Sequence, residues 1–299
     1  MKRESYFVAC LGAWGFFADD AKLGEAAERI ADYYSRMGEQ TKSHEVSKYF
    51  GQWTDGAAAM GAQVGLAQSF AKAGDEPNTT AAINDLIADF NDQPAFAEAA
   101  FDVASQCFYK HNYAQAMRLW NLAYGREHLL ERHHQEIPYL LATCHKRTGN
   151  RETAIEYYKQ ALDKYPQSQY SYRAAYRIGL ACRELGQFEE AVYWLDEQRK
   201  RYSDPLHSRR ALMQKAIVCY WDLKDYQKGV DVLQQYTGDY PGEDRTCVAY
   251  RLMAKCYEKL GDRAQAIAVL EEALDEFAGT KRETQISNEL AEMREGDAK

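Results

Sequence analysis

The chain has 299 residues, a formal net charge of −8 and a pI near 5.5, and 46% of its residues are hydrophobic. This apolar fraction is sufficient for a continuous core, whereas the acidic balance argues against a nucleic-acid-binding protein, whose electrostatic footprint is normally basic. The seven cysteines include no Cys-x-x-Cys pair, which argues against a disulfide framework and favours a reducing compartment.

Residues 1–22 form a separate N-terminal segment. Its basic start and the apolar run from Tyr6 to Ala18 resemble a secretory signal, although Glu4 and Phe16 do not suit the charged region and the cleavage site. The alternative is an apolar helix that packs on the first repeat. A signal over residues 1–18 would place the protein in a bacterial periplasm, whereas the cysteines favour the cytoplasm. The run is too short to span a bilayer, so we expect no integral membrane insertion.

From residue 24 onward the sequence repeats at intervals of 36 to 38 residues. The repeats start near residues 24, 60, 97, 135, 172, 210 and 247, and the two clearest copies lie between Ile137 and Pro205. A period of this length is typical of a solenoid. We therefore expect a repeat array over residues 23–279, followed by a capping helix and a frayed tail over residues 280–299.

Each repeat predicts two helices joined by a tight turn. The first helix has apolar or small residues at positions 4, 7, 8 and 11, which form one stripe of a 3.6-residue period. Glycine near position 15 closes this helix in the left-handed conformation. The turn glycines are Gly38, Gly74, Gly149, Gly186 and Gly261.

The second helix carries three further signals. Position 20 is small and is expected to approach position 8 closely, as at Ala116, Ala154, Ala191, Gly229 and Ala266. An aromatic ring at position 31 fills the gap toward the next repeat, as at Phe90, Tyr165, Tyr202, Tyr240 and Phe277. Proline or glycine then ends the helix, as at Pro94, Pro166, Pro205, Pro241 and Gly279. We also expect an insertion around residues 75–78 and an extension of the third repeat's second helix through Glu131.

These features resemble the tetratricopeptide repeat. Small residues at positions 8 and 20, aromatic residues at 11 and 24 and proline near 32 match that pattern in the repeats that begin at Gln135, Tyr172 and Cys247. The period is longer than the family's 34 residues, and the family's tryptophan at position 4 is absent. The resemblance implies an all-α, right-handed superhelical solenoid of about seven helix-turn-helix repeats with a C-terminal capping helix. Long repeats that end in Tyr-Pro resemble those of bacterial envelope proteins.

Candidate metal and catalytic sites are weak in this sequence. The histidine-rich stretch 128–136 lacks the His-Glu-x-x-His order that places two imidazoles on one helix face. Position 11 reads Cys107, His145 and Cys182 in successive repeats. Helices lie about 8–10 Å apart, however, so one zinc ion with ligands at about 2.0–2.3 Å cannot bridge them. We therefore expect no metal, no cofactor and no enzymatic activity, and we interpret these residues as core and surface.

The concave surface of such a superhelix is the candidate binding site, because positions 2, 5, 6, 9, 12 and 13 of the first helices border it. The candidate groove residues are Tyr139, Thr143, Lys146, Arg173, Tyr176, Arg177, Arg183, Gln214, Trp221, Arg251 and Lys255. Arginine suits bidentate carboxylate recognition and aromatic rings provide contact area, which predicts an acidic peptide with an apolar anchor. The alternative is that the arginines pair with neighbouring glutamates such as Glu184.

The family's dicarboxylate clamp for chaperone tails uses asparagine at position 9. This position is Thr143, Leu180, Val218 and Lys255 in four of the repeats, so that ligand class does not carry over. The sequence therefore predicts a non-catalytic scaffold that binds a peptide or partner protein. The alternatives are a periplasmic envelope-assembly factor and a self-associating module that forms homo-oligomers.

Overall fold

The computed structural model describes residues 29–30, 33–34, 37, 42, 57–126, 130, 133–201 and 205–295. Within these residues the fold is entirely helical and contains no strand. The first compact unit, residues 1–149, contains α4 (Ala57–Ala73), α5 (Glu76–Phe90), α6 (Phe96–Tyr109), α7 (Tyr113–Tyr124) and α8 (Ile137–Arg147). The N-terminal segment 1–22, the repeat start near residue 24 and the tail 296–299 lie outside the described residues.

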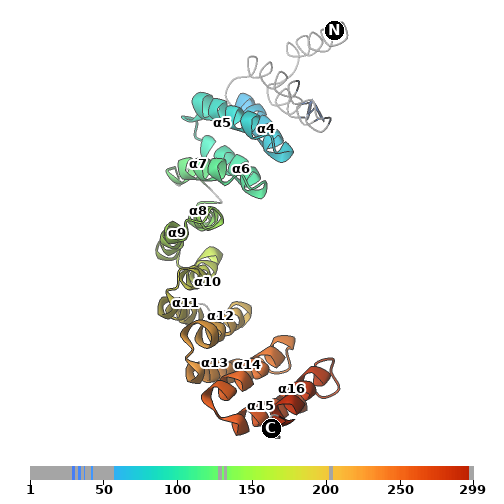
Figure 1. Ribbon diagram of the computed structural model, residues 1–299. Coiled ribbons are helices and arrows are strands. Elements are labelled where there is room, and N and C mark those ends of the chain that lie inside the picture. The colour runs from blue at the N-terminus through green and yellow to red at the C-terminus, as the bar shows by residue number, and fades with distance from the viewer. Residues whose placement is uncertain are drawn as a thin grey trace. The chain divides into compact units, whose positions relative to one another are not determined.

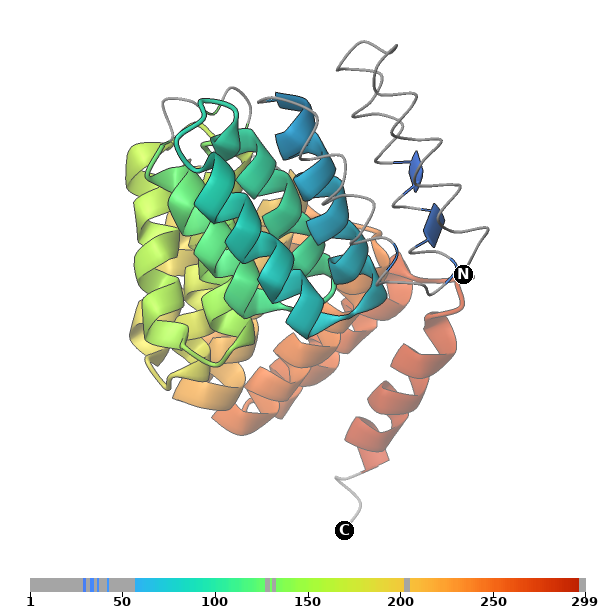
Figure 2. The ribbon, with the colours of Figure 1, turned by 90° about the horizontal axis from the view of Figure 1, so that it is seen from above.

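The second compact unit, residues 150–299, contains the remaining helices. They are α9 (Arg151–Lys164), α10 (Gln169–Glu184), α11 (Phe188–Arg201), α12 (Pro205–Ile217), the π-helical turn η2 (Val218–Leu223), α13 (Tyr226–Asp239), α14 (Asp244–Leu260), α15 (Arg263–Glu276) and α16 (Glu283–Glu295). In the first unit α4 packs against both α5 and α6, and α7 packs against α6 and α8, whereas in the second unit consecutive helices pack against one another in chain order (Figures 1 and 2). The all-α repeat fold predicted from the sequence is therefore confirmed.

The turns between the two helices of a repeat share one backbone feature throughout the described array. Position 15 is left-handed in every described repeat, whether or not it is glycine. The residues are Gly74 (φ 74°), His111 (φ 64°), Gly149 (φ 90°), Gly186 (φ 75°), Lys224 (φ 54°) and Gly261 (φ 79°). This position therefore requires a left-handed backbone conformation. In two repeats a residue with a side chain, His111 or Lys224, adopts it at a cost in free energy that glycine avoids.

Small residues allow the two helices of a repeat to approach closely. A Cβ atom added to Gly179 on α10 would lie 3.0 Å from Leu195 Cγ and 3.2 Å from the carbonyl oxygen of Ala191 on α11. Gly179 and Ala191 are positions 8 and 20 of one repeat, so the predicted contact is present there. No larger residue fits at Gly179 without displacing the backbone of α11.

The repeat that begins at residue 210 departs from this register. Its position 8 is Ile217, which is only half-buried, and the π-helical turn η2 follows directly. Val218 and Cys219 are fully buried instead, and a Cβ atom on Gly229 would lie 3.8 Å from Cys219 Cβ. Because a π-turn accommodates one extra residue, the inward-facing positions shift along the chain.

Three expectations about helix boundaries were wrong. Residues 76–78 are no insertion, because Pro77 lies in the first turn of α5 and Asp75 caps that helix by accepting a hydrogen bond from Asn78 N (3.2 Å). Helix α7 ends at Tyr124, with Gly125 as its cap, and does not run through Glu131. Pro205 does not end a helix but begins α12, where a missing N–H has no cost.

Hydroxyl groups seal the junctions between repeats. Ser171 Oγ donates to the carbonyl oxygens of Tyr165 (2.5 Å) and Ala161 (2.9 Å), which end the preceding helix α9. Thr246, at the equivalent position two junctions further along the chain, donates to the carbonyl oxygen of Tyr240. Sequence periodicity did not reveal this pairing, which satisfies carbonyl groups that a helix end would otherwise bury without a partner.

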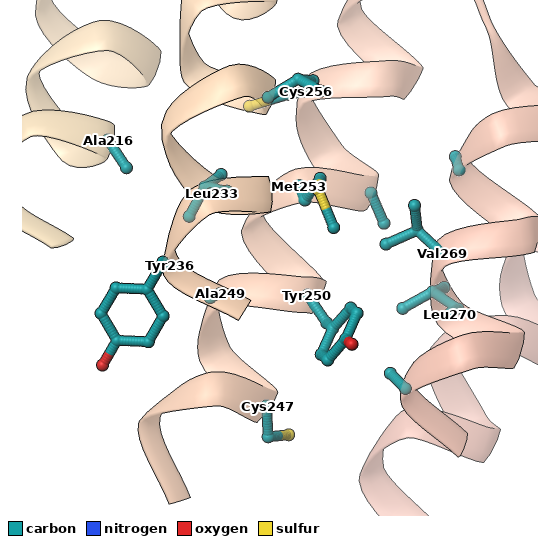
Figure 3. Packing of buried hydrophobic residues seen from close by; sticks show 14 of the residues in the cluster. Ala216, Leu233, Tyr236, Cys247, Ala249, Tyr250, Met253, Cys256, Val269 and Leu270 are labelled. Carbon is teal, nitrogen blue, oxygen red and sulfur yellow. The ribbon is translucent and has the colours of Figure 1, made fainter. Parts of the chain in front are cut away.

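The core of the second unit is continuous across α12 to α16. Tyr236 and Leu233 on α13, Met253 on α14 and Leu270 on α15 all lie between the helices (Figure 3). Ile286 and Leu290 on α16 are also buried, so α16 is the capping helix that the sequence predicted over residues 280–294. No helix among the described residues is long and apolar enough to cross a membrane.

Candidate functional site

In the first unit, the predicted groove residues Tyr139, Thr143 and Lys146 lie on α8 and are half-buried. Thr143 Oγ1 donates to the carbonyl oxygen of Tyr139 (2.8 Å), which leaves this hydroxyl only its acceptor capacity for a ligand. The other eight predicted residues lie in the second unit, on α10, α12, η2 and α14.

Several predicted cations of the second unit form ion pairs within the chain. Arg183 Nε lies 2.5 Å from Asp222 Oδ2, and Arg251 forms a two-pronged pair with Glu289 on α16, with Nε 2.7 Å from Oε2. The neighbouring Glu184 accepts a hydrogen bond from Arg151 Nε (2.6 Å). Arg183 and Arg251 therefore link first helices to neighbouring helices, and the positive charge of each is neutralised by a carboxylate of the same chain.

Arg173 and Arg177 on α10 have a different environment, because both side chains are exposed. The Arg173 guanidinium lies 5.9 Å from the ring centroid of Tyr172, and the part of the chain that the structure describes gives it no ion pair. Tyr176 is half-buried between them in sequence. This segment of α10 therefore presents positive charge and an aromatic ring to solvent.

Two further arginines join this segment from neighbouring first helices. Arg210 on α12 and Arg245 on α14 are exposed, and neither has an ion pair within the described residues. Together with Arg177 they are the charged groups that act on the Tyr176 hydroxyl. We call Arg173, Tyr176, Arg177, Arg210 and Arg245 the arginine face.

The charged groups that act on Tyr176 are all positive. Burial raises the pKa of Tyr176, and the charges of Arg177, Arg210 and Arg245 partly offset this rise. The phenol is therefore a protonated hydrogen-bond donor at neutral pH, next to guanidinium groups from three helices. Such a set of donors favours an anionic ligand that contains oxygen, such as a carboxylate.

Sequence reasoning missed Arg210 and Arg245, which fall at positions 1 and 36 of the repeat that begins at residue 210. The numbering placed the first helices too late, because α12 begins at Pro205 and α14 at Asp244. A proline in the first turn of a helix is common. Interpreting Pro205 in this way would have placed Arg210 in the second turn of α12.

The π-helical turn η2, which follows α12, carries Trp221, whose side chain is 64% exposed. Its ring stands edge-on to Tyr220, with ring centroids 4.8 Å apart. Gln214 is half-buried, whereas Lys255 is exposed and borders a hollow between α14, α15 and α16. Trp221 thus remains the candidate apolar anchor, 11 residues after Arg210 in the chain.

The cysteines and histidines of position 11 lie in the repeat cores. Cys107 and Cys182 are buried, and burial raises the pKa of each thiol to about 11. Desolvation lowers the pKa of His145. In the described part of the histidine-rich stretch, the ring of His133 stacks on Phe101 at 4.1 Å, and its Nδ1 lies 2.5 Å from Glu136. The described residues contain no cluster of three groups that could hold a metal ion.

The comparisons with known proteins agree with the repeat geometry. Family models described as tetratricopeptide repeat match residues 139–205, 210–242 and 249–280. The chain therefore contains tetratricopeptide repeats between residues 139 and 280. The matched residues begin at α8 and extend to the end of α15, so they include most of the arginine face and the helices that carry it. Members of this family are interaction scaffolds and are typically non-catalytic, and this chain is therefore a protein-interaction scaffold.

No curated protein matches the chain. Among solved structures, a crystal structure of the MamA protein is 18% identical, with a TM-score of 0.49, and the alignment covers 61% of this chain and 92% of that one. The MamA fragment from residue 41 onward of Desulfovibrio magneticus RS-1 is 15% identical, with a TM-score of 0.46, covering 60% and 94%. These likenesses are too distant to inform on function.

Proposed function

We propose that the protein binds an acidic segment of a partner protein on its arginine face. The observation that supports this proposal is the difference between the arginines of the second unit. Arg183 and Arg251 have carboxylate partners inside the chain, whereas Arg173, Arg210 and Arg245 are exposed and have none among the described residues.

The spacing of these groups suits a peptide. Arg210 and Arg245 come from the first helices α12 and α14, and the charges of both act on the Tyr176 hydroxyl of α10. Two carboxylates a few residues apart in a partner segment therefore meet two guanidinium groups at once. Trp221, in η2 after α12, provides exposed aromatic area for an apolar residue of the same segment.

Peptide selection tests this proposal. Random twelve-residue peptides displayed on phage are selected on the full-length protein, and we expect the enriched sequences to carry aspartate or glutamate. The triple variant Arg173→Ala, Arg210→Ala, Arg245→Ala should bind the best synthetic peptide at least tenfold more weakly, because each charge-assisted contact contributes about 1.5–3 kcal/mol. The affinity of the wild type should also fall as salt screens the exposed charges.

The matched control removes three positive charges elsewhere, by Lys72→Ala, Lys110→Ala and Lys281→Ala, all at exposed positions. This variant should bind the selected peptide with an affinity within about twofold of the wild type. Selected peptides without acidic residues, or equal binding by the arginine variant and the wild type, would refute the proposal.

A further inference from the structure

A surface hollow of about 530 Å³ lies between α13 and α15, with α14 as its floor. Its lining includes residues from all three helices and from the turn after α13. The residues are Gln234, Thr237, Gly238, Pro241, Tyr250, Met253, Tyr257, Gln265, Ala268, Val269, Glu272 and Glu276. None of the arginine-face residues is among them, so this is a separate surface of the second unit.

The carboxylates of Glu272 and Glu276 both contact the neutral hydroxyl group of Tyr250 in this hollow. The hydroxyl of Tyr250 lies 3.0 Å from Glu272 Oε1 and 2.8 Å from Glu276 Oε2. The backbone N–H of Gly242 also donates to Glu276, at 2.5 Å. Burial raises the pKa of Tyr250, and the hydrogen bonds to the two carboxylates raise it further, so the phenol stays protonated between them.

The lining contains no lysine, arginine or histidine among the residues that the structure describes. Elsewhere in the second unit, carboxylates near repeat junctions have cationic partners, such as Asp222 with Arg183 and Glu289 with Arg251. Glu272 and Glu276 have a phenol and an amide instead. The hollow therefore carries the negative charge of two neighbouring carboxylates without a cation to neutralise it.

The floor of the hollow is apolar and aromatic. Figure 3 shows Met253 and Tyr250 on α14 facing Val269 on α15. The ring of Tyr257 completes one wall, and its hydroxyl accepts a hydrogen bond from Gln234 Nε2 (3.3 Å). A hollow with an apolar floor, aromatic walls and two carboxylates matches a side chain that has a methylene stem and a cationic head.

We propose that this hollow binds an arginine side chain of a second partner protein. The guanidinium group would donate to Glu272 and Glu276, and its stem would lie on Met253 and Val269. Arginine suits the site better than lysine, because its planar group donates to two carboxylates at once. The scaffold thereby has two docking surfaces of opposite charge, the arginine face for an acidic segment and this hollow for a basic one.

Methyl NMR of the full-length protein tests the site directly. Methionine ε-methyl groups are labelled with carbon-13, and acetyl-arginine-amide is added as the probe, with acetyl-citrulline-amide as its neutral analogue. We expect a saturable shift of the Met253 methyl signal with the arginine probe alone. The signal of Met213, which is buried on α12, should not move. Equal shifts with both probes would overturn the proposal.

The variant Glu272→Gln, Glu276→Gln separates charge from structure, because a glutamine oxygen still accepts the Tyr250 hydrogen bond. We expect it to weaken the arginine probe at least tenfold. The control Glu271→Gln, Asp275→Asn removes the same charge from the same helix at residues that do not line the hollow. This control should retain binding, and an equal loss in both variants would overturn the specific role of the hollow.

Two further measurements identify the source of the arginine. Peptides selected on the wild type after depletion on the Glu272→Gln, Glu276→Gln variant should be enriched in arginine, and a pool without this enrichment would contradict the proposal. The second measurement is the mass of the protein at several concentrations by sedimentation equilibrium. A mass that rises with concentration in the wild type and not in the variant would assign the hollow to a second copy of the chain and overturn our assignment to another protein.

Discussion

Replacement of Gly179 by alanine tests the closest helix contact in the second unit. The added methyl group would lie 3.0 Å from Leu195 Cγ and 3.2 Å from the carbonyl oxygen of Ala191, and the latter is backbone that moves only with α11. Overpacking of this kind costs about 1–3 kcal/mol. Alanine in place of glycine inside a helix returns about 1 kcal/mol. We therefore expect a net loss of about 1 kcal/mol in the free energy of unfolding.

Gly61→Ala is the matched control, because Gly61 is also inside a helix, α4, and a methyl group added there would have no neighbouring atom within 4 Å. It should gain about 0.5–1 kcal/mol. Urea denaturation followed by far-UV circular dichroism gives both values, and hydrogen exchange of amides in α10 and α4 assigns each change to its own unit. Stabilisation of similar size in both variants would show that α10 and α11 do not pack as closely as described.

Other predictions concern turns, junctions and thiols. Lys224→Gly should raise the free energy of unfolding by up to about 1 kcal/mol in urea denaturation, because glycine adopts the left-handed backbone conformation of this position without strain. A decrease in the free energy of unfolding would contradict this expectation. Ser171→Ala should destabilise the protein by about 1 kcal/mol, since the Tyr165 carbonyl loses a hydrogen-bond donor. An unchanged urea midpoint would refute a stabilising role for this hydrogen bond. Burial raises the pKa of the Cys144 thiol to about 12, above its value in the unfolded chain. The stability that comes from keeping this thiol protonated is therefore complete below about pH 8.5 and is lost as the pH rises toward 12, because the unfolded chain then loses the proton first. Replacement of the seventh cysteine, Cys10, by serine leaves the six cysteines that the structure shows as buried. Their thiols should react slowly with a disulfide reagent at pH 8, and rapid reaction would contradict their burial.

The repeat architecture could be predicted because its signals are local. Glycine at position 15 and small residues at positions 8 and 20 recur in register, and each has a steric reason that needs no knowledge of distant residues. His111 and Lys224 escaped the same reasoning, because they adopt the left-handed turn without the residue type that announces it. The π-helical turn was equally hidden, since a periodic pattern cannot show where one extra residue is absorbed.

The candidate binding surface was only partly predictable. The helical register placed Arg173 and Arg177 on an exposed face, but the state of each arginine depends on residues many positions away. Asp222 neutralises Arg183 from 39 residues further along the chain, and Glu289 neutralises Arg251 from 38. Such pairs join different repeats, and their partners cannot be chosen from one repeat's sequence. The hollow at Tyr250 was missed for the same reason, because three helices contribute to it.

The shared left-handed turn has a consequence for how such a chain can change. Position 15 has a positive φ in glycine and non-glycine repeats alike, so each described helix pair has a left-handed backbone at the same point of its turn. The side chains that we propose to bind ligands lie on the helices of these pairs, apart from the turn. Duplication or deletion of one whole repeat would therefore alter the length of the array and its set of recognition residues together, while every remaining turn keeps its form.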